Sequence, residues 1–204
     1  MYIKICGLQT AETVATAIDA GADAVGFIFA PGSPRTVTAA HAAKLVHHVP
    51  TGIETVGVFR NQPLNEVLKT SREARLTTVQ LHGEEPLSDV VHLRREGFLT
   101  LRAFAVAAYN ALTQEEKLAW ESERILLDAV EPGAGVTFDS NELAQGAPAG
   151  FWLLAGGLNP TNVAALAQAL HPNGVDVSSG VESSRGVKDS AMIRNFIQAA
   201  RTVS

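Results

Sequence analysis

Residues 151–180 read FWLLAGGLNPTNVAALAQALHPNGVDVSSG, and this stretch decides the fold that the sequence predicts. An apolar run over residues 151–157 ends at two glycines, an alanine-rich segment follows over residues 159–170, and a second apolar run covers residues 174–180. Continuous apolar runs are typical of parallel strands buried on both faces, and Pro160 favours a helix start. The stretch therefore predicts two parallel strands joined by a helix.

The same alternation extends through the whole chain of 204 residues. Six further apolar runs predict strands at residues 2–7, 24–29, 54–59, 77–83, 100–106 and 124–130. Further helices are expected at Thr10–Ala20, Thr38–His48, Pro63–Ala74, Pro86–Glu96, Thr113–Glu123 and Lys188–Arg201, with a weakly helical segment at 141–145. Eight strand–helix units predict a single-domain (β/α)8 TIM barrel of the phosphate-binding type over residues 1–204. The alternative, a doubly wound open sheet, normally carries GxGxxG after its first strand, and this chain has CGLQTAET there.

The composition is that of a globular protein with ample material for a core. Hydrophobic residues make up 46% of the chain and charged residues 18%, and the net charge of −5 gives no basic field for nucleic acid or anionic lipid. A single cysteine excludes an internal disulfide and zinc sites built on CxxC pairs. Without a signal peptide or an apolar run near the ~20 residues that span a bilayer, we expect a cytoplasmic protein.

Small residues follow the seventh and eighth predicted strands. In a TIM barrel, chemistry comes from the C-terminal ends of the strands, and the last two loops commonly bind phosphate. Gly156 and Gly157 end one strand, and Ser179 and Gly180 end the next, where a short helix is expected. Their backbone N–H groups could approach an anion closely, which predicts a phosphate site. The alternative is that these glycines only make tight turns.

Two strand ends carry candidates for acid and base. Asp128 ends the run RILLDA, and partial desolvation at a barrel mouth would favour a protonated carboxyl, which suits a general acid. Its alternative role is a helix cap or a structural hydrogen bond. Cys6 precedes Gly7 at the end of the first strand and is either a catalytic thiol or inert packing. Lys4, on the same strand face, would lower the pKa of Cys6 or pair structurally with a carboxylate.

Arg35 and His82 complete the set of candidates from the strand ends. Arg35 lies in the loop after the second strand, where its guanidinium would suit a substrate carboxylate or stand in solvent. His82 ends the fourth strand as a titrating, lining or structural residue. No group of His, Asp and Glu with metal-ligand spacing recurs at the strand ends, so no metal is expected.

With these residues in place, the sequence resembles the phosphoribosylanthranilate isomerases, the (β/α)8 enzymes of tryptophan biosynthesis. The resemblance covers all eight units and is specific in the order and spacing of its motifs. These motifs are KICGL, GADAVGFIF with SPR, VGVF, VQLHG, LLDA before GAGVTFD, LAGGLNPTNV and GVDVSSGVESSRGVKD.

The resemblance implies an Amadori rearrangement of N-(5′-phosphoribosyl)anthranilate, without a metal or organic cofactor. It implies that Asp128 is the general acid and Cys6 the general base, and that Arg35 holds the substrate near its anthranilate end. His82 is assigned with the substrate-binding residues. The phosphate site is matched by Gly156, Gly157, Ser179 and Gly180. The expected partner is a small phosphorylated substrate, and the chain would be a monomer or a homodimer.

Two departures and three alternatives stay open at this point. Ala134 stands where the family usually has a hydroxyl residue, and Ser140 stands where it has tryptophan, which puts turnover or substrate affinity in question. The histidine-pathway sugar isomerase would carry an aspartate where Cys6 stands, and a pentose-phosphate epimerase would need metal-binding histidines. A non-catalytic barrel used as a binding module would be expected to have lost Cys6 or Asp128.

Overall fold

Eight parallel strands form a closed barrel in a computed structural model that describes residues 1–128 and 146–203. The strands are joined in chain order, and β8 pairs with β1 to close the ring. Their bounds are β1 Tyr2–Cys6, β2 Ala24–Ile28, β3 Glu54–Phe59, β4 Thr78–Leu81, β5 Leu99–Ala105, β6 Ile125–Asp128, β7 Trp152–Ala155 and β8 Gly174–Val177. The predicted TIM barrel is confirmed, and the open-sheet alternative is wrong.

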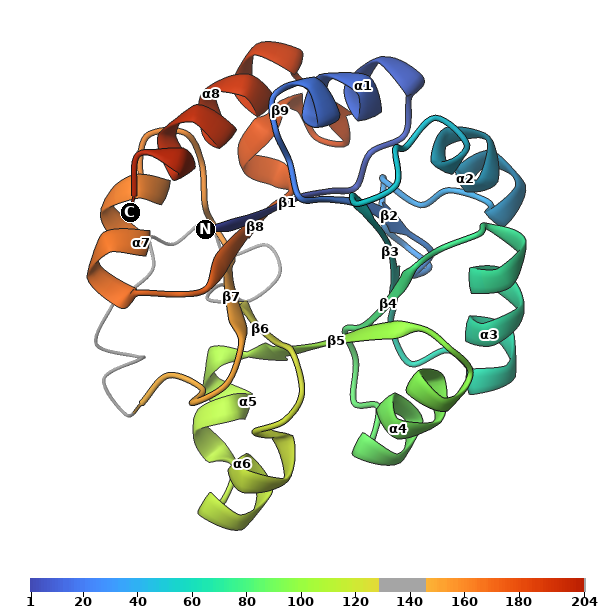
Figure 1. The fold of residues 1–204 in the computed structure, drawn as a ribbon, viewed down its shortest axis with the longest axis vertical. Coiled ribbons are helices and arrows are strands. Elements are labelled where there is room, and N and C mark those ends of the chain that lie inside the picture. Colours follow the sequence, from blue (N-terminus) through green and yellow to red (C-terminus); the bar gives the residue numbers. More distant parts are fainter. Residues whose placement is uncertain (129–145, 204) are drawn as a thin grey trace.

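Helices surround the barrel and cover the outer face of its strands (Figure 1). Their bounds are α1 Ala11–Asp19, α2 Ala39–Val46, α3 Leu64–Glu73, α4 Leu87–Arg95, α5 Val106–Ala111, α6 Gln114–Trp120, α7 Val163–Leu170 and α8 Ser190–Arg201. Thr10 and Thr38 cap α1 and α2, and Thr113 forms a complete capping box with Glu116 at α6. Within the described ranges, every helix is too short or too polar to cross a membrane.

The structure differs from the sequence prediction after β5, at the start of α7, after β8 and at the start of α8. Helix α7 begins at Val163, three residues after the predicted start at Pro160. The short helix α5 precedes α6 and was not expected. After β8 comes a 3₁₀ turn, Ser179–Val181, in place of the expected short helix, and then an unexpected hairpin of β9 Glu182–Ser184 and β10 Val187–Lys188. The last helix begins at Ser190 rather than Lys188, because the Asp189 side chain accepts the first backbone N–H groups. The helical segment expected at 141–145 lies outside the described residues.

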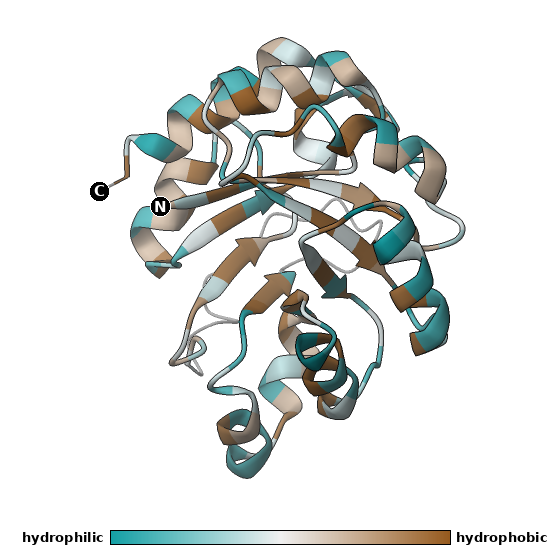
Figure 2. Cartoon of the chain, turned by 45° about the vertical axis from the view of Figure 1, so that its right-hand side comes forward, coloured by the Kyte–Doolittle hydropathy of each residue, from teal (hydrophilic) through white to brown (hydrophobic). Residues whose placement is uncertain are grey.

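A large apolar layer lies between the strands and the helices. The smaller interior of the barrel has an apolar part and a polar part. Strands are coloured mainly apolar in Figure 2, whereas the helices alternate apolar and polar residues. One part of the interior, on β5, β6 and β7, is an apolar cluster of Leu101, Ala103, Leu126, Leu153 and Ala155. Polar side chains are buried on β1, β4 and β8, namely Lys4, Gln80 and Asp176. Cys6 therefore lies on the polar side of the interior, and Asp128 ends a strand of the apolar side.

Charged and aromatic side chains occupy the N-terminal end of the barrel. Arg124 donates to Glu54 over 3.0 Å, and Thr78 donates to the same carboxylate over 2.7 Å. The Arg124 guanidinium also lies over the rings of Tyr2 and Phe151. These residues begin or immediately precede their strands, so they leave the opposite, C-terminal end of the barrel for a site.

The chain ends are tied together at the start of β1. The Arg201 guanidinium, at the end of α8, donates to the Met1 carbonyl over 2.5 Å and to Asp23 over 2.8 Å. The buried face of α8 carries Ile193, Phe196 and Ile197. This helix therefore fastens the last turn of the chain to the first two strands.

Replacing Phe196 by alanine is expected to destabilise the fold by about 3–5 kcal/mol, because the ring is completely buried and its removal leaves a cavity. Urea denaturation measures the free energy of unfolding. Gln198→Ala, at an exposed position of the same helix, is the matched control and should change it by less than about 0.5 kcal/mol. Equal effects of the two changes would contradict the role given to this helix.

Candidate active site

Cys6 lies at the C-terminal end of β1 with only 5% of its surface exposed. Its strand partner on β2 is Gly26, and a Cβ atom there would lie 3.0 Å from the Cys6 Sγ and 3.3 Å from Lys4 Cε. The two side chains of β1 therefore pack tightly against the backbone of Gly26 inside the barrel.

The charge state of Cys6 depends on opposing effects. Burial raises the pKa of the thiol most strongly, the Lys4 ammonium lowers it, the Asp176 carboxylate raises it and Lys188 lowers it. The net direction is upward, so the unliganded protein favours the thiol at neutral pH. The sequence left two roles open for Lys4, and the structure contains both: it lowers the pKa of Cys6 and forms an ion pair of 2.8 Å with Asp176.

Asp128 ends β6 and meets His82, which follows β4. The His82 Nε2 lies 3.5 Å from the Asp128 Oδ2, although β5 separates the two strands. The Gln80 amide nitrogen lies 3.2 Å from the other ring nitrogen, Nδ1, so both ring nitrogens of His82 have a polar neighbour. Both side chains are partly exposed, and they meet across the C-terminal end of the barrel.

Arg102, on β5, supports the segment that carries His82. Its buried guanidinium donates to the carbonyl groups of Leu81 and Gly83, one on each side of His82. It also lies 4.3 Å from the centre of the Phe104 ring. Burial lowers its pKa, and the nearby Glu85 raises it by less. Arg102 is thus a structural residue of this strand end.

Arg35 reaches from the loop after β2 to the loop after β8. Its Nε and Nη2 donate to the two carboxylate oxygens of Glu182 over 2.5 and 2.8 Å. Its Cδ lies so close to Gly7 that a Cβ atom at that position would be 2.7 Å away. The structure therefore places Arg35 beside the residue that follows Cys6. Sequence analysis placed Arg35 in this loop but did not foresee its carboxylate partner.

Glu182 and Lys188 form a buried charge cluster that sequence reasoning missed. The Lys188 ammonium donates to Glu182 over 2.7 Å and to the Ser178 carbonyl over 2.9 Å, and the Gly186 N–H donates to Glu182. Burial alone would raise the pKa of Glu182, but these hydrogen bonds and that from Arg35 lower it to about 2. Both residues lie in the motif GVDVSSGVESSRGVKD, so two charged residues in the segment after β8 were the available signal.

The loops after β7 and β8 are packed closely against each other. Gly156 and Gly157 have φ angles of +88° and +63°, which favour glycine. A Cβ atom at Gly180 would lie 1.7 Å from the Leu158 carbonyl oxygen, so the two loops are in direct contact there. The four residues predicted to bind phosphate, Gly156, Gly157, Ser179 and Gly180, are thus brought together at the same end of the barrel as Cys6.

Within the described ranges, His, Cys, Asp and Glu side chains do not gather in threes that could hold a metal ion. The departures at Ala134 and Ser140 lie outside the described residues.

Comparison with known proteins identifies the family. A model of the family described as N-(5'phosphoribosyl)anthranilate (PRA) isomerase matches residues 3–199. The chain belongs to this family. The resemblance inferred from the motifs is confirmed, and the alternatives of a histidine-pathway isomerase or a pentose-phosphate epimerase are wrong.

Individual relatives agree over nearly the whole chain. The N-(5'-phosphoribosyl)anthranilate isomerase of Pelobacter propionicus is 40% identical over 203 residues, which are 98% of this chain and 95% of the relative. The crystal structure of TrpF from Jonesia denitrificans is 43% identical, with a TM-score of 0.88 over 100% of this chain and 98% of that chain. A phosphoribosyl anthranilate isomerase in complex with reduced 1-(o-carboxyphenylamino)-1-deoxyribulose 5-phosphate is 32% identical, with a TM-score of 0.84 over 100% of both chains.

Replacing Glu182 by glutamine tests the charge cluster through its pH dependence. A carboxylate whose pKa falls on folding stabilises the fold above its unfolded pKa, and this contribution is lost as the pH falls through the folded pKa. Near neutral pH, the free energy of unfolding of the wild type should therefore exceed that of Glu182→Gln. This difference should shrink as the pH falls from the ordinary pKa of 4.5 to the folded pKa of about 2.

Urea denaturation at several pH values measures this difference. The matched control is Glu66→Gln at an exposed position of α3, which should leave the free energy of unfolding nearly unchanged near neutrality. A difference between wild type and Glu182→Gln that stays constant over the whole range would contradict the assignment.

Proposed function

We propose that this chain converts N-(5′-phosphoribosyl)anthranilate into 1-(2-carboxyphenylamino)-1-deoxyribulose 5-phosphate, with Asp128 as general acid and Cys6 as general base. The proposal is supported by family membership over residues 3–199. It is also supported by the positions of Cys6 and Asp128, which both lie at the C-terminal end of the barrel. An acid and a base on different strands can act on two sides of one sugar.

The residue types suit an Amadori rearrangement. Asp128 donates a proton to the ring oxygen of the ribose, the C1′–O bond breaks, and the lone pair of the amine nitrogen forms an iminium ion. That cation makes the C2′ proton acidic, and the Cys6 thiolate accepts it, while the C–H electron pair neutralises the iminium. The resulting enolamine tautomerises to the aminoketone. Each positioned acid or base typically contributes about 10²–10⁴-fold.

Two anchoring groups would hold the ends of the substrate. The loops after β7 and β8 supply backbone N–H groups for the phosphate, through Gly156, Gly157, Ser179 and Gly180. Arg35 would bind the anthranilate carboxylate: a guanidinium carries five N–H donors, and Glu182 engages only Nε and Nη2. The complex of the 32% identical relative with a reduced phosphorylated product supports a ligand of this class.

His82, predicted to be a substrate-binding residue, would also position the acid. Its Nε2 faces the Asp128 carboxyl group and limits the directions in which that group can turn. The proposal includes a cytoplasmic location and no cofactor, and it leaves a monomer and a homodimer equally open.

Cys6→Ser and Asp128→Asn should each reduce kcat by about 10²-fold or more, because each change removes one proton-transfer group. The assay follows the loss of anthranilate-type fluorescence after fresh preparation of phosphoribosylanthranilate. The circular dichroism spectrum and Tm of each variant should match those of the wild type. Turnover like that of the wild type in either variant would remove that residue from the mechanism, and an inactive wild-type protein would favour the binding-module alternative.

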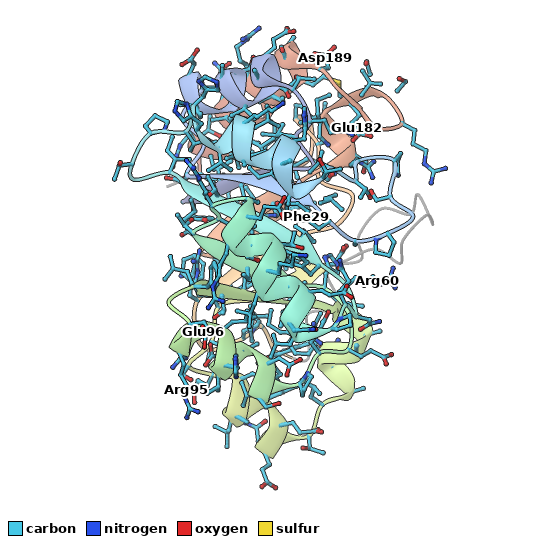
Figure 3. All side chains as sticks on the ribbon, turned by 90° about the vertical axis from the view of Figure 1, so that its right-hand side faces the viewer. Phe29, Arg60, Arg95, Glu96, Glu182 and Asp189 are labelled. Carbon is cyan, nitrogen blue, oxygen red and sulfur yellow. The ribbon has the colours of Figure 1, made fainter. Side chains whose placement is uncertain are left out.

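Arg35→Ala should raise KM about tenfold or more and change kcat less, because it removes a charged hydrogen bond to the substrate. Arg60→Ala is the matched control, since this exposed arginine follows β3 at the same end of the barrel, opposite Arg95 and Glu96 (Figure 3). Identical kinetics of Arg35→Ala and the wild type would assign Arg35 to the Glu182 cluster alone.

A further inference from the structure

Lys4 is a completely buried cation that the proposed reaction does not use. It is among the largest side chains with no exposed surface, and its ammonium donates to Asp176 on the neighbouring strand β8. Burying an ion pair costs several kcal/mol per ion before attraction, and well-packed apolar residues often serve stability as well. Packing alone therefore gives no strong reason for a charged pair inside this barrel.

The surroundings of the pair suggest what the charge does. Lys4 and Cys6 are two residues apart on β1, so both side chains point into the barrel. A Cβ atom added at Gly26 on β2 would lie 3.0 Å from the Cys6 Sγ and 3.3 Å from the Lys4 Cε, so these two side chains are neighbours. The lysine stem and the thiol thus share one small space against β2, in which Lys4 is completely buried and Cys6 is 5% exposed.

We propose that Lys4 supplies the positive charge that stabilises the thiolate of Cys6, and that Asp176 holds the ammonium in position. Both are positioning residues, since they act through Cys6. The inference rests on the proposed function, in which the Sγ must accept the C2′ proton. Lys4 keeps its own proton throughout: the thiolate takes a proton and becomes a thiol, and the ammonium is charged before and after.

The other charges near Cys6 come from three further elements. Asp176 on β8 opposes the thiolate, and Lys188 on β10 favours it. Arg35, in the loop after β2, also faces the thiol, but it shares the Glu182 carboxylate with Lys188. Of these groups, Lys4 lowers the pKa of Cys6 most. Burial of Lys4 would lower its own pKa, but Asp176 raises it further, so the ammonium stays protonated.

A paired substitution separates this proposal from a purely structural pair. Lys4→Met with Asp176→Leu removes both charges together, so neither partner is left buried and unpaired. Lys4→Gln with Asp176→Asn removes the same charges but keeps a hydrogen bond between the strands. The matched control is Arg124→Met with Glu54→Gln, which removes an ion pair at the other end of the same barrel, away from the thiol.

The readout is the ionisation of Cys6 itself. The chain has one cysteine, so labelling with [3-¹³C]cysteine gives one resonance whose shift follows the thiol–thiolate equilibrium against pH. We expect the pKa of Cys6 to rise by about one unit or more in both Lys4–Asp176 pairs, which is a tenfold loss of thiolate below the pKa. The Arg124–Glu54 pair should leave it unchanged.

The outcomes are separable from the proposed function because the titration needs no substrate. An unchanged or lowered pKa of Cys6 in either Lys4–Asp176 pair that folds would overturn the role of Lys4, even if Cys6→Ser is inactive. Full turnover of Cys6→Ser would instead overturn the proposed base. If both proposals are correct, the two Lys4–Asp176 double variants should regain activity as the pH is raised, because more of Cys6 becomes thiolate. If the pair is purely structural, its removal should not shift the pH dependence of activity.

Discussion

The pairing of β1 with β8 is the constraint on which the rest of the structure depends. It closes the barrel, and its register puts Lys4 opposite Asp176. These residues are 172 positions apart in the chain, yet their side chains form an ion pair of 2.8 Å. The same closure brings the loop after β8 beside Gly7, so the thiol, the phosphate-binding candidates and Arg35 share one end of the barrel. Without it, none of these groups would be neighbours.

The division of the barrel interior explains how one fold holds both a stable core and a reactive site. Leucine and alanine side chains on β5, β6 and β7 fill one part of the interior and have no polar atoms that need a partner. Charged side chains gather around β1 and β8, where the Lys4 ammonium pairs with Asp176 and the Lys188 ammonium pairs with Glu182. A buried thiol is thereby placed among charges that are held in position by their ion pairs.

The sequence predicted the barrel well because its signals are local and repeated. Apolar runs, threonine caps and prolines at helix starts act over a few residues, and eight repetitions leave few possible topologies. It also placed Cys6, Asp128, Arg35 and the last two loops at the correct end, because a barrel puts every strand end there. The contacts of these residues were beyond it: the His82–Asp128 pair crosses the ring, and the Arg35–Glu182 pair joins residues 147 positions apart. The hairpin after β8 also escaped prediction, since its two strands are only three and two residues long.

Closure by the first and last strands also has a consequence for biosynthesis. While the chain is being made, β1 leaves the ribosome with the hydrogen-bonding groups of one edge and the charge of Lys4 still lacking their partners. Both must wait for β8, whose Asp176 follows Lys4 by 172 positions. Unpaired strand edges and long-range closure are the slow, aggregation-prone features of folding. The nascent polypeptide is therefore expected to need protection until β8 has emerged and paired with β1.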